Sequence, residues 1–272
     1  MVTTRAFNCI NTINAEDFLG DFFMIKQEYK WLTDTFVAHR GLFNNVDIPE
    51  NSIPAFVEAR ENNFGIELDV QMSSDGVLVV FHDDSLKRMT GADGLVCEKT
   101  FEELRKLRLL DTDCQIPTFE EFLQAAGGVN LVVEIKTHKN IGELEQKVVD
   151  ALANYQGNYC IESFNPYIVR WFKVHAPHII RGQLATDLSN TKMAKWKVWL
   201  LKHLKLCKWN GSQFIAYDAE YITTVKEVKR FGKKIPIVCW TIKSQEQYDN
   251  LKDHFENIIF DSFMPIRYDL EK

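Results

Sequence analysis

Strand-like apolar segments alternate with helical segments along most of this chain, and no other feature limits its possible folds so strongly. Alternation of this kind is typical of parallel βαβ units. We expect eight parallel strands, at residues 35–39, 65–70, 130–136, 159–164, 179–185, 214–218, 235–241 and 258–261. We expect helices at residues 52–62, 100–109, 118–126, 141–154, 165–174, 221–231 and 244–253.

Two of the expected strands carry carboxylates on one face. In GIELDV (65–70), Glu67 and Asp69 alternate with aliphatic residues, and LVVEIK (131–136) repeats the pattern with Glu134 and then Lys136. Successive side chains of a strand point to opposite faces, so these carboxylates share one face. Burying unpaired like charges is costly, and a divalent cation with oxygen ligands relieves that cost. We predict a metal site at Glu67, Asp69 and Glu134; a strand with one hydrated polar face is the alternative.

Two histidines end apolar runs. His39 ends TFVAH (35–39), and His82 ends LVVFH (78–82). Barrel enzymes place their catalytic side chains at the ends of otherwise apolar strands. An isolated histidine is more often structural, but two histidines together with three inward carboxylates indicate an active site.

Short motifs follow one another in order between residue 36 and about residue 262. They are HRG (39–41), PENS (49–52), ELDVQMSSDG (67–76), HDDSLKRMTG (82–91), IPTFEEFL (116–123), VEIK (133–136), SFN (163–165) and CWT (239–241). The ordered set resembles the glycerophosphodiester phosphodiesterase family, which usually has Thr where Ser52 stands. The resemblance covers most of the chain, and the set is far more specific than any one motif.

The resemblance implies a metal-dependent enzyme that hydrolyses glycerophosphodiesters to glycerol phosphate and an alcohol. It implies attack by the neighbouring glycerol hydroxyl, which gives a cyclic phosphate that water then opens. His39 and His82 are the expected acid and base, in either order, because imidazole titrates near neutral pH. Arg40 and Lys136 are expected to hold phosphate oxygens, and Trp240 to contact the glycerol or leaving group, unless it only packs in the core. Three carboxylates favour Mg²⁺ or Ca²⁺ over zinc.

The fold that the resemblance implies is an α/β (β/α)8 TIM barrel, and a chain of 272 residues is the usual size for one such barrel. Residues 77–82 are expected to form a β-hairpin extension after the second strand, which brings His82 to the barrel mouth. Residues 14–33 are expected to form a helix that closes the bottom of the barrel or packs on its side, within an N-terminal helical extension (1–34). Without a linker or repeat, residues 1–272 are expected to form one domain.

Several residues beside the motifs have open roles. Asn51 either caps the helix that follows or belongs to the site, and Glu50 either orients His39 or favours the helix N-terminus. Asp83 is expected to be a turn residue. Asp261 is expected to fix hydrogen bonds at the mouth, and Phe164 to be part of the pocket wall.

Composition narrows the expected partners and location. A net charge of −6 gives no reason to expect nucleic acid, and the resemblance implies a small-molecule glycerophosphodiester substrate. Six scattered cysteines without CxxC pairs are typical of reduced thiols in a cytoplasmic protein. The first residues lack a secretory signal pattern, and no run approaches the roughly 18 apolar residues that span a membrane.

The segment Lys192–Asn210 is basic and contains three tryptophans. A helix of this composition can lie on an anionic membrane surface, which would suit a substrate with a fatty chain. The alternative, which the expected barrel favours, is a helix after the fifth strand whose broad apolar face packs on the barrel.

Two other functions remain open. A lysophospholipase D or sphingomyelinase D would use a similar set of residues, and a catalytically silent barrel could bind a phosphorylated ligand. Retention of both histidines and all three carboxylates favours an active phosphodiesterase.

Overall fold

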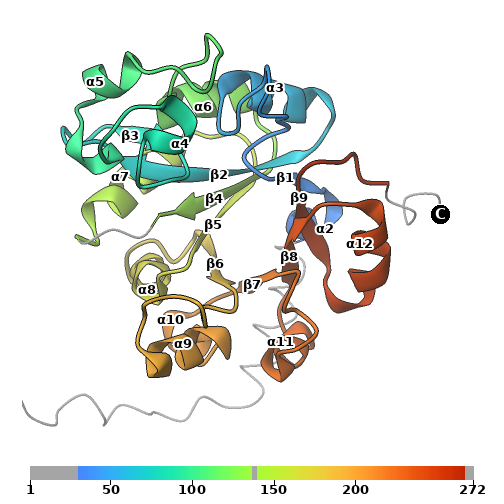
Figure 1. Ribbon diagram of the computed structural model, residues 1–272. Helices are drawn as coiled ribbons and strands as arrows, with labels where there is room; N and C mark the ends of the chain where they lie inside the picture. Colours follow the sequence, from blue (N-terminus) through green and yellow to red (C-terminus); the bar gives the residue numbers. More distant parts are fainter. Residues whose placement is uncertain (1–29, 137–139, 267–272) are drawn as a thin grey trace, which may run out of the picture.

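The computed structural model describes residues 30–136 and 140–266, which form a closed barrel of parallel strands surrounded by helices (Figure 1). The barrel strands are β1 (Val37–Ala38), β2 (Gly65–Met72), β4 (Leu131–Ile135), β5 (Tyr159–Ser163), β6 (Ile180–Ala185), β7 (Phe214–Asp218), β8 (Ile237–Ile242) and β9 (Asn257–Phe260). Strand β1 pairs in parallel with both β2 and β9, and this double pairing closes the sheet. The predicted (β/α)8 barrel is therefore confirmed.

The ninth strand, β3 (Leu78–Val80), runs antiparallel to β2, as the sequence predicts. The chain then makes an excursion through α4 (Lys87–Thr90), η1 (Val96–Glu98) and α5 (Phe101–Arg105). This excursion has a small core of its own, which includes Phe81, Met89 and Ile116. It therefore holds the residues after β3 in a fixed position beside the barrel mouth.

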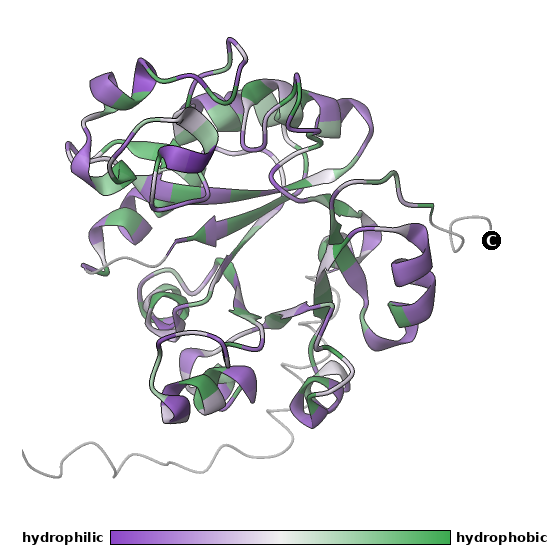
Figure 2. Cartoon of the chain, viewed as in Figure 1, coloured by the Kyte–Doolittle hydropathy of each residue, from purple (hydrophilic) through white to green (hydrophobic). Residues whose placement is uncertain are grey.

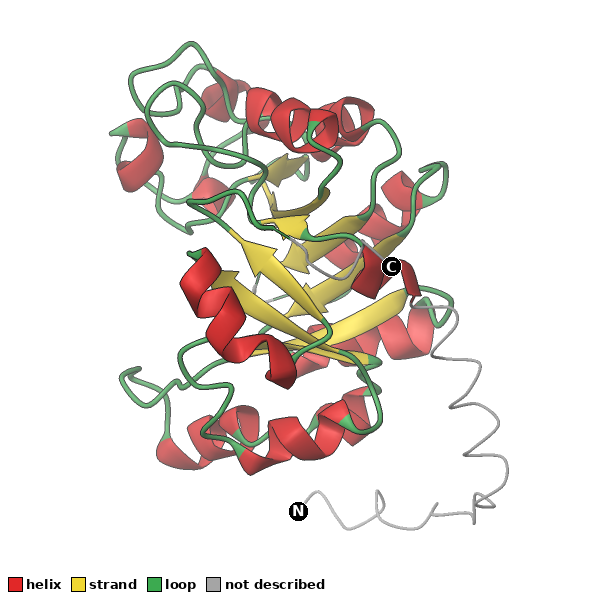
Figure 3. Cartoon of the chain, turned by 90° about the vertical axis from the view of Figure 1, so that its right-hand side faces the viewer, coloured by secondary structure: helices red, strands yellow, loops and turns green. Residues whose placement is uncertain are grey.

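The remaining helices lie outside the strands, as Figure 3 shows. They are α3 (Ile53–Glu61), α6 (Phe119–Ala126), α7 (Glu143–Leu152), α8 (Pro166–His175), α9 (Lys195–Lys202), α10 (Cys207–Asn210), α11 (Lys226–Gly232), α12 (Gln245–Leu251) and the short η2 (Lys252–His254). The helix predicted at 100–109 ends at Arg105, because the Arg105 carbonyl accepts a hydrogen bond from Gln115 as the chain folds back.

The single helix expected across Lys192–Asn210 is wrong: the segment forms α9 and α10 instead. Leu204 has a positive φ of 53°, and the backbone N–H groups of Leu204 and Lys205 donate to the last carbonyls of α9. A left-handed residue with such bonds is a usual way for a helix to end.

The bottom of the barrel is covered by α2 (Lys30–Asp34). Leu32 is buried in the barrel interior with Val37 and Phe214, and its carbonyl accepts a hydrogen bond of 2.6 Å from Asn257 at the start of β9. This is the position expected for the end of the helix at 14–33; residues 14–29 lie outside the described part of the chain. None of the described helices is long and apolar enough to cross a membrane.

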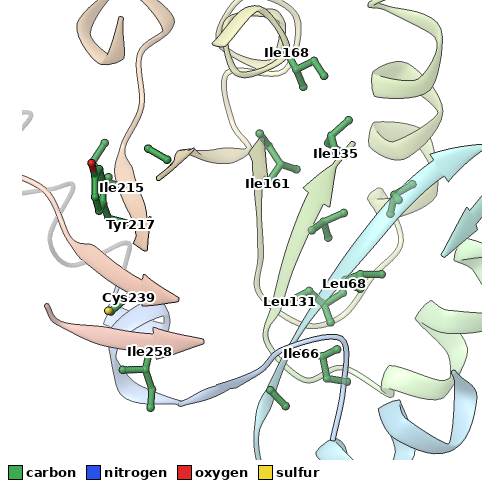
Figure 4. Packing of buried hydrophobic residues seen from close by; sticks show 14 of the residues in the cluster. Ile66, Leu68, Leu131, Ile135, Ile161, Ile168, Ile215, Tyr217, Cys239 and Ile258 are labelled. Atoms are coloured by element: carbon green, nitrogen blue, oxygen red, sulfur yellow. The ribbon is translucent and has the colours of Figure 1, made fainter. Parts of the chain in front are cut away.

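The main core lies between the strands and the helices. Ile66, Leu68, Leu131 and Ile135 are buried there, on the outer faces of β2 and β4 (Figure 4). Because side chains alternate along a strand, Glu67, Asp69 and Glu134 point from the same strands into the barrel. The outward aliphatic packing thus fixes the direction of the carboxylates.

Candidate active site

The three predicted metal ligands meet inside the barrel. Asp69 on β2 pairs in register with Glu134 on the neighbouring β4, and Glu67 lies one pleat earlier on β2. All three are buried, and one oxygen from each lies within 4.8 Å of the others.

The ammonium of Lys136 lies between two of these carboxylates, 3.3 Å from Asp69 Oδ1 and 3.0 Å from Glu134 Oε1. Burial would raise the pKa of Asp69, but Lys136 and His82 hold it well below its usual range. Burial and the adjacent anions raise the pKa of Glu67 well above its usual range, and burial raises the pKa of Glu134 to about 7. Without a cation, the cluster therefore retains protons near neutral pH.

This cluster fits one divalent cation. Bonds from Ca²⁺ to oxygen are about 2.3–2.6 Å, so two ligands on opposite sides of the ion lie roughly 5 Å apart. The separation of up to 4.8 Å between the carboxylate oxygens is within this span. The donors are all carboxylate oxygens, which suit Mg²⁺ or Ca²⁺ better than zinc.

The two predicted catalytic histidines both line the pocket above the cluster. His39 Nδ1 lies 3.1 Å from Asp261 Oδ2, and His82 Nδ1 lies 2.6 Å from Asp83 Oδ1. A carboxylate at Nδ1 favours the tautomer with the proton there, which leaves Nε2 available for proton transfer. Burial lowers the pKa of both histidines although these carboxylates raise it.

These contacts decide two of the open roles. Asp261 fixes a hydrogen bond at the mouth, as expected. Asp83 does more than form a turn, because it contacts His82 and also accepts hydrogen bonds of 2.6 and 3.0 Å from Arg88.

Arg88 belongs to an arginine pair that the sequence interpretation missed. Glu50 Oε1 accepts hydrogen bonds of 2.7 Å from both Arg40 and Arg88, a role that the sequence did not predict. Burial opposes ionisation of Glu50, but the bonds from Arg88 and Arg40 lower its pKa to about 2. The only sequence signal for Arg88 was its place in the HDDSLKRMTG motif.

Asn51 belongs to the site. The hydroxyl of Ser52 caps α3, accepting a bond of 3.4 Å from the Ala55 backbone N–H, while Asn51 Nδ2 donates to Asp69 Oδ2 at 2.8 Å. Asn51 therefore orients one of the candidate metal ligands.

The HRG motif forms a tight turn beneath α3. The Arg40 backbone N–H donates to Glu67 Oε2 at 3.0 Å, and Arg40 Nε lies 3.4 Å from Asp69 Oδ2. Gly41 has a φ of +81°, and a Cβ there would lie 2.8 Å from the Ala55 carbonyl carbon. Only glycine fits this turn, which places Arg40 and His39 against the carboxylates.

Glu162 on β5 is a fourth buried carboxylate that the sequence interpretation missed. It pairs in register with Glu134, lines the pocket, and its Oε2 has no hydrogen-bond partner among the described residues. Burial and the nearby Glu134 raise its pKa well above the usual range. The alternation in YCIES (159–163) was the available signal, since it places Glu162 on the inward face with Cys160.

The pocket has a volume of about 330 Å³ and an apolar side opposite the charged residues. Trp240 and Phe164 line it with Leu184 and Ile259, and the Trp240 and Phe164 rings meet edge to face at 5.7 Å. Trp240 is thus part of the pocket wall, as is Phe164. The wall could cover the carbon skeleton of a small ligand.

Comparison with known proteins supports the resemblance seen in the motifs. A family model described as the glycerophosphoryl diester phosphodiesterase family matches residues 39–261. The glycerophosphodiester phosphodiesterase of Caldanaerobacter subterraneus subsp. tengcongensis is 38% identical over 163 residues, which are 54% of this chain and 65% of that protein. Glycerophosphodiester phosphodiesterase 1 of Mus musculus is 27% identical over 259 residues, covering 84% of this chain and 78% of that protein.

A solved structure agrees in fold. The Oleispira antarctica phosphodiesterase, in complex with the product sn-glycerol-3-phosphate, matches with a TM-score of 0.70 at 22% identity, covering 84% of this chain and 92% of that one. Because the family model spans most of the chain, including both histidines and all three carboxylates, this protein belongs to the glycerophosphoryl diester phosphodiesterase family.

Proposed function

We propose that this chain hydrolyses glycerophosphodiesters to glycerol phosphate and an alcohol, with one Mg²⁺ or Ca²⁺ ion. One observation carries the proposal: two histidines, each with a carboxylate at Nδ1, line a pocket above a buried carboxylate cluster. The names of the relatives and the product bound to the Oleispira antarctica enzyme point to the same substrate class.

Glu67, Asp69 and Glu134 would hold the cation, which neutralises and orients the phosphate when bound. Arg40 and Lys136 are the proposed donors to the non-bridging phosphate oxygens, because both lie beside the cluster. Trp240 and Phe164 would cover the carbon atoms of the glycerol or the leaving alcohol.

The reaction would proceed in two steps. In the first, the neighbouring glycerol hydroxyl gives its proton to Nε2 of one neutral histidine and its oxygen attacks phosphorus. The other histidine, protonated, gives a proton to the departing alkoxide, and a cyclic phosphate forms. In the second step, water opens the ring while the histidines exchange roles. The carboxylates at Nδ1 keep both rings oriented throughout.

The test is a ³¹P NMR assay with glycerophosphocholine, run in chelator and after addition of Mg²⁺, Ca²⁺ or Zn²⁺. We expect no turnover in chelator and recovery with Mg²⁺ or Ca²⁺; full activity in chelator, or recovery with zinc alone, contradicts the proposal. An analogue without the neighbouring hydroxyl should be nearly inert, and normal turnover of it would exclude the cyclic phosphate.

The same assay separates the other functions. Turnover of a lysophospholipid without turnover of glycerophosphodiesters would identify a lipid-directed phosphodiesterase. Binding of glycerol phosphate by calorimetry, with no turnover of either substrate class, would identify a silent barrel.

A further inference from the structure

Large apolar side chains remain exposed just before α9, on α9 and α10, and at the start of α8. Trp196 is 63% exposed, Trp199 52%, Trp209 39%, Met193 39% and Tyr167 63%. Val198 is buried and Leu204 and Cys207 pack on the barrel, as one alternative predicted, but they are only part of the apolar face, and the large side chains named above stay exposed. Clustered exposed apolar side chains usually mark an interaction surface.

The same segment concentrates positive charge on an acidic chain. Between Asp187 and Asp218 there are six lysines and no carboxylate, whereas the whole chain has a net charge of −6. Lys202 and Lys205 form ion pairs with Asp187 and Glu227, which attach the segment to the barrel. In Figure 2, the hydrophilic and hydrophobic colours of α9 lie side by side.

Lys195 and Lys197 are exposed, and within the described ranges no carboxylate forms an ion pair with either of them. Their charge is therefore available to an external anion.

Cations lie directly over the exposed rings. Lys197 Nζ is 5.5 Å from the Trp196 ring centre, Lys205 Nζ is 5.0 Å from that of Trp199, and the Arg170 guanidinium is 4.7 Å from that of Trp209. Indole rings and cations side by side suit the head-group region of a bilayer, where rings enter the acyl boundary and cations meet phosphates. We propose that this surface (Tyr167, Arg170 and residues 192–209) docks on an anionic phospholipid bilayer.

The position of the surface agrees with this use. The chain enters α9 from the C-terminal end of β6, and Lys202 is fixed there by Asp187 at 2.7 Å and by a hydrogen bond of 3.0 Å from Tyr217 to its carbonyl. Leu184 of β6 lines the pocket, so the docking surface begins at the mouth end of the barrel. A bilayer would contact the lysines and the apolar side chains together, whereas a nucleic acid would leave Met193 in water.

The test measures binding of the full chain to vesicles by co-sedimentation without any substrate. Vesicles of phosphatidylcholine with about 30% phosphatidylserine should bind the chain, pure phosphatidylcholine should bind it much less, and salt should release it. The bound chain should show a blue shift of tryptophan fluorescence.

Lys195→Glu/Lys197→Glu and Trp196→Ala/Trp199→Ala should each weaken binding to the anionic vesicles by at least about tenfold. The matched control Lys106→Glu/Lys252→Glu makes the same charge change at exposed positions outside the surface and should bind within about twofold of the wild type. Far-UV circular dichroism checks that every variant is folded.

Equal binding to neutral and anionic vesicles overturns the proposal, and so does equal weakening of binding in the control variant. Binding to a single-stranded RNA is measured in parallel, and RNA binding without vesicle binding also overturns the proposal. The inference does not depend on the proposed function, because vesicle binding is measured without turnover. A chain that binds vesicles but hydrolyses no glycerophosphodiester would refute the proposed function and leave the docking surface intact.

Discussion

At the scale of single residues, a neighbouring carboxylate favours one tautomer of each pocket histidine. Asp261 and Asp83 hold Nδ1 of His39 and His82, so both rings offer Nε2 to the pocket. The contacts therefore favour the same tautomer in both rings, and the proposed acid and base roles would be divided by the positions of the rings relative to the substrate.

His39→Ala and His82→Ala should each lower the turnover of glycerophosphocholine by about 10²–10⁴-fold, because each would remove one of the two proposed proton-transfer groups. A nitrophenyl phosphodiester that keeps the neighbouring hydroxyl needs little protonation of its leaving group. It should therefore restore most of the rate in the variant that lost the acid, and not in the other. Similar responses of both variants in steady-state kinetics would show that acid and base roles are not divided between them.

Glu162→Gln should stabilise the metal-free protein at pH 8.5. The folded-state pKa of Glu162 is raised, so the folded chain holds a proton that the unfolded chain has lost, and stability falls as pH rises toward that pKa. The lowered pKa values of His39 and His82 make stability rise with pH, but only below the usual histidine value of 6.5. The variant and the wild type should therefore be compared between pH 7 and 8.5.

Urea denaturation in chelator measures this effect. With Glu162→Gln, the free energy of unfolding should fall less steeply as pH rises. The difference in slope should be up to about 1.4 kcal/mol per pH unit, the value for one proton. The exposed Glu61→Gln is the control and should follow the wild type. A slope unchanged by Glu162→Gln would mean that this carboxylate is ionised in the folded chain.

At the scale of elements, one family motif is structural rather than catalytic. In IPTFEEFL, Thr118 caps α6: its hydroxyl accepts from the Glu121 backbone N–H at 3.0 Å, and Glu121 Oε2 accepts from the Thr118 backbone N–H at 2.9 Å. Glu121 also forms two hydrogen bonds with Arg105, which join α6 to α5. The motif thus fixes where α6 begins beneath the excursion that carries His82.

Thr118→Ala should lower the free energy of unfolding by about 1 kcal/mol, the usual cost of losing an N-cap side chain. Thr118→Ser keeps the hydroxyl and is the matched control, with an expected loss of only a few tenths of a kcal/mol. Thermal and urea denaturation measure the difference, and kcat/KM should change little in either variant. Equal stability of the two variants would refute the role of the cap.

At the scale of the whole molecule, pairing of β2 with β4 brings the carboxylates together, and ion binding should report on the folded barrel. The proposed Mg²⁺ or Ca²⁺ ion would bind the folded chain only, so adding it should raise the Tm, by the equivalent of about 2.7 kcal/mol at 100 times the Kd. The effect should be larger at pH 8 than at pH 6, because Glu134, with a pKa raised to about 7, must lose its proton to bind the ion.

Differential scanning calorimetry in chelator and in excess cation measures this stabilisation. Asp69→Asn removes one of the three proposed ligands, and its Tm should respond to the cation much less than that of the wild type. A Tm that does not depend on the cation at either pH would exclude the metal site.

The sequence by itself determined the strands, the hairpin and the direction of three carboxylates. Alternation along 65–70 and 131–136 is a property of a few consecutive residues, and the outward aliphatic positions allow only one orientation of the strand. The helix ends were less certain, because the end of α5 and the break between α9 and α10 depend on contacts such as Gln115 with the Arg105 carbonyl.

Only the tertiary structure decided which side chains surround the predicted ones. Asp261 reaches His39 across 222 residues of sequence, and Arg88 reaches Glu50 across 38. Glu162 becomes a pocket residue only because β5 lies beside β4. Whether Trp196 and Trp199 are buried depends likewise on the neighbouring helices. Periodicity is local and can be read along the chain, whereas partners and exposure arise when separate elements pack together.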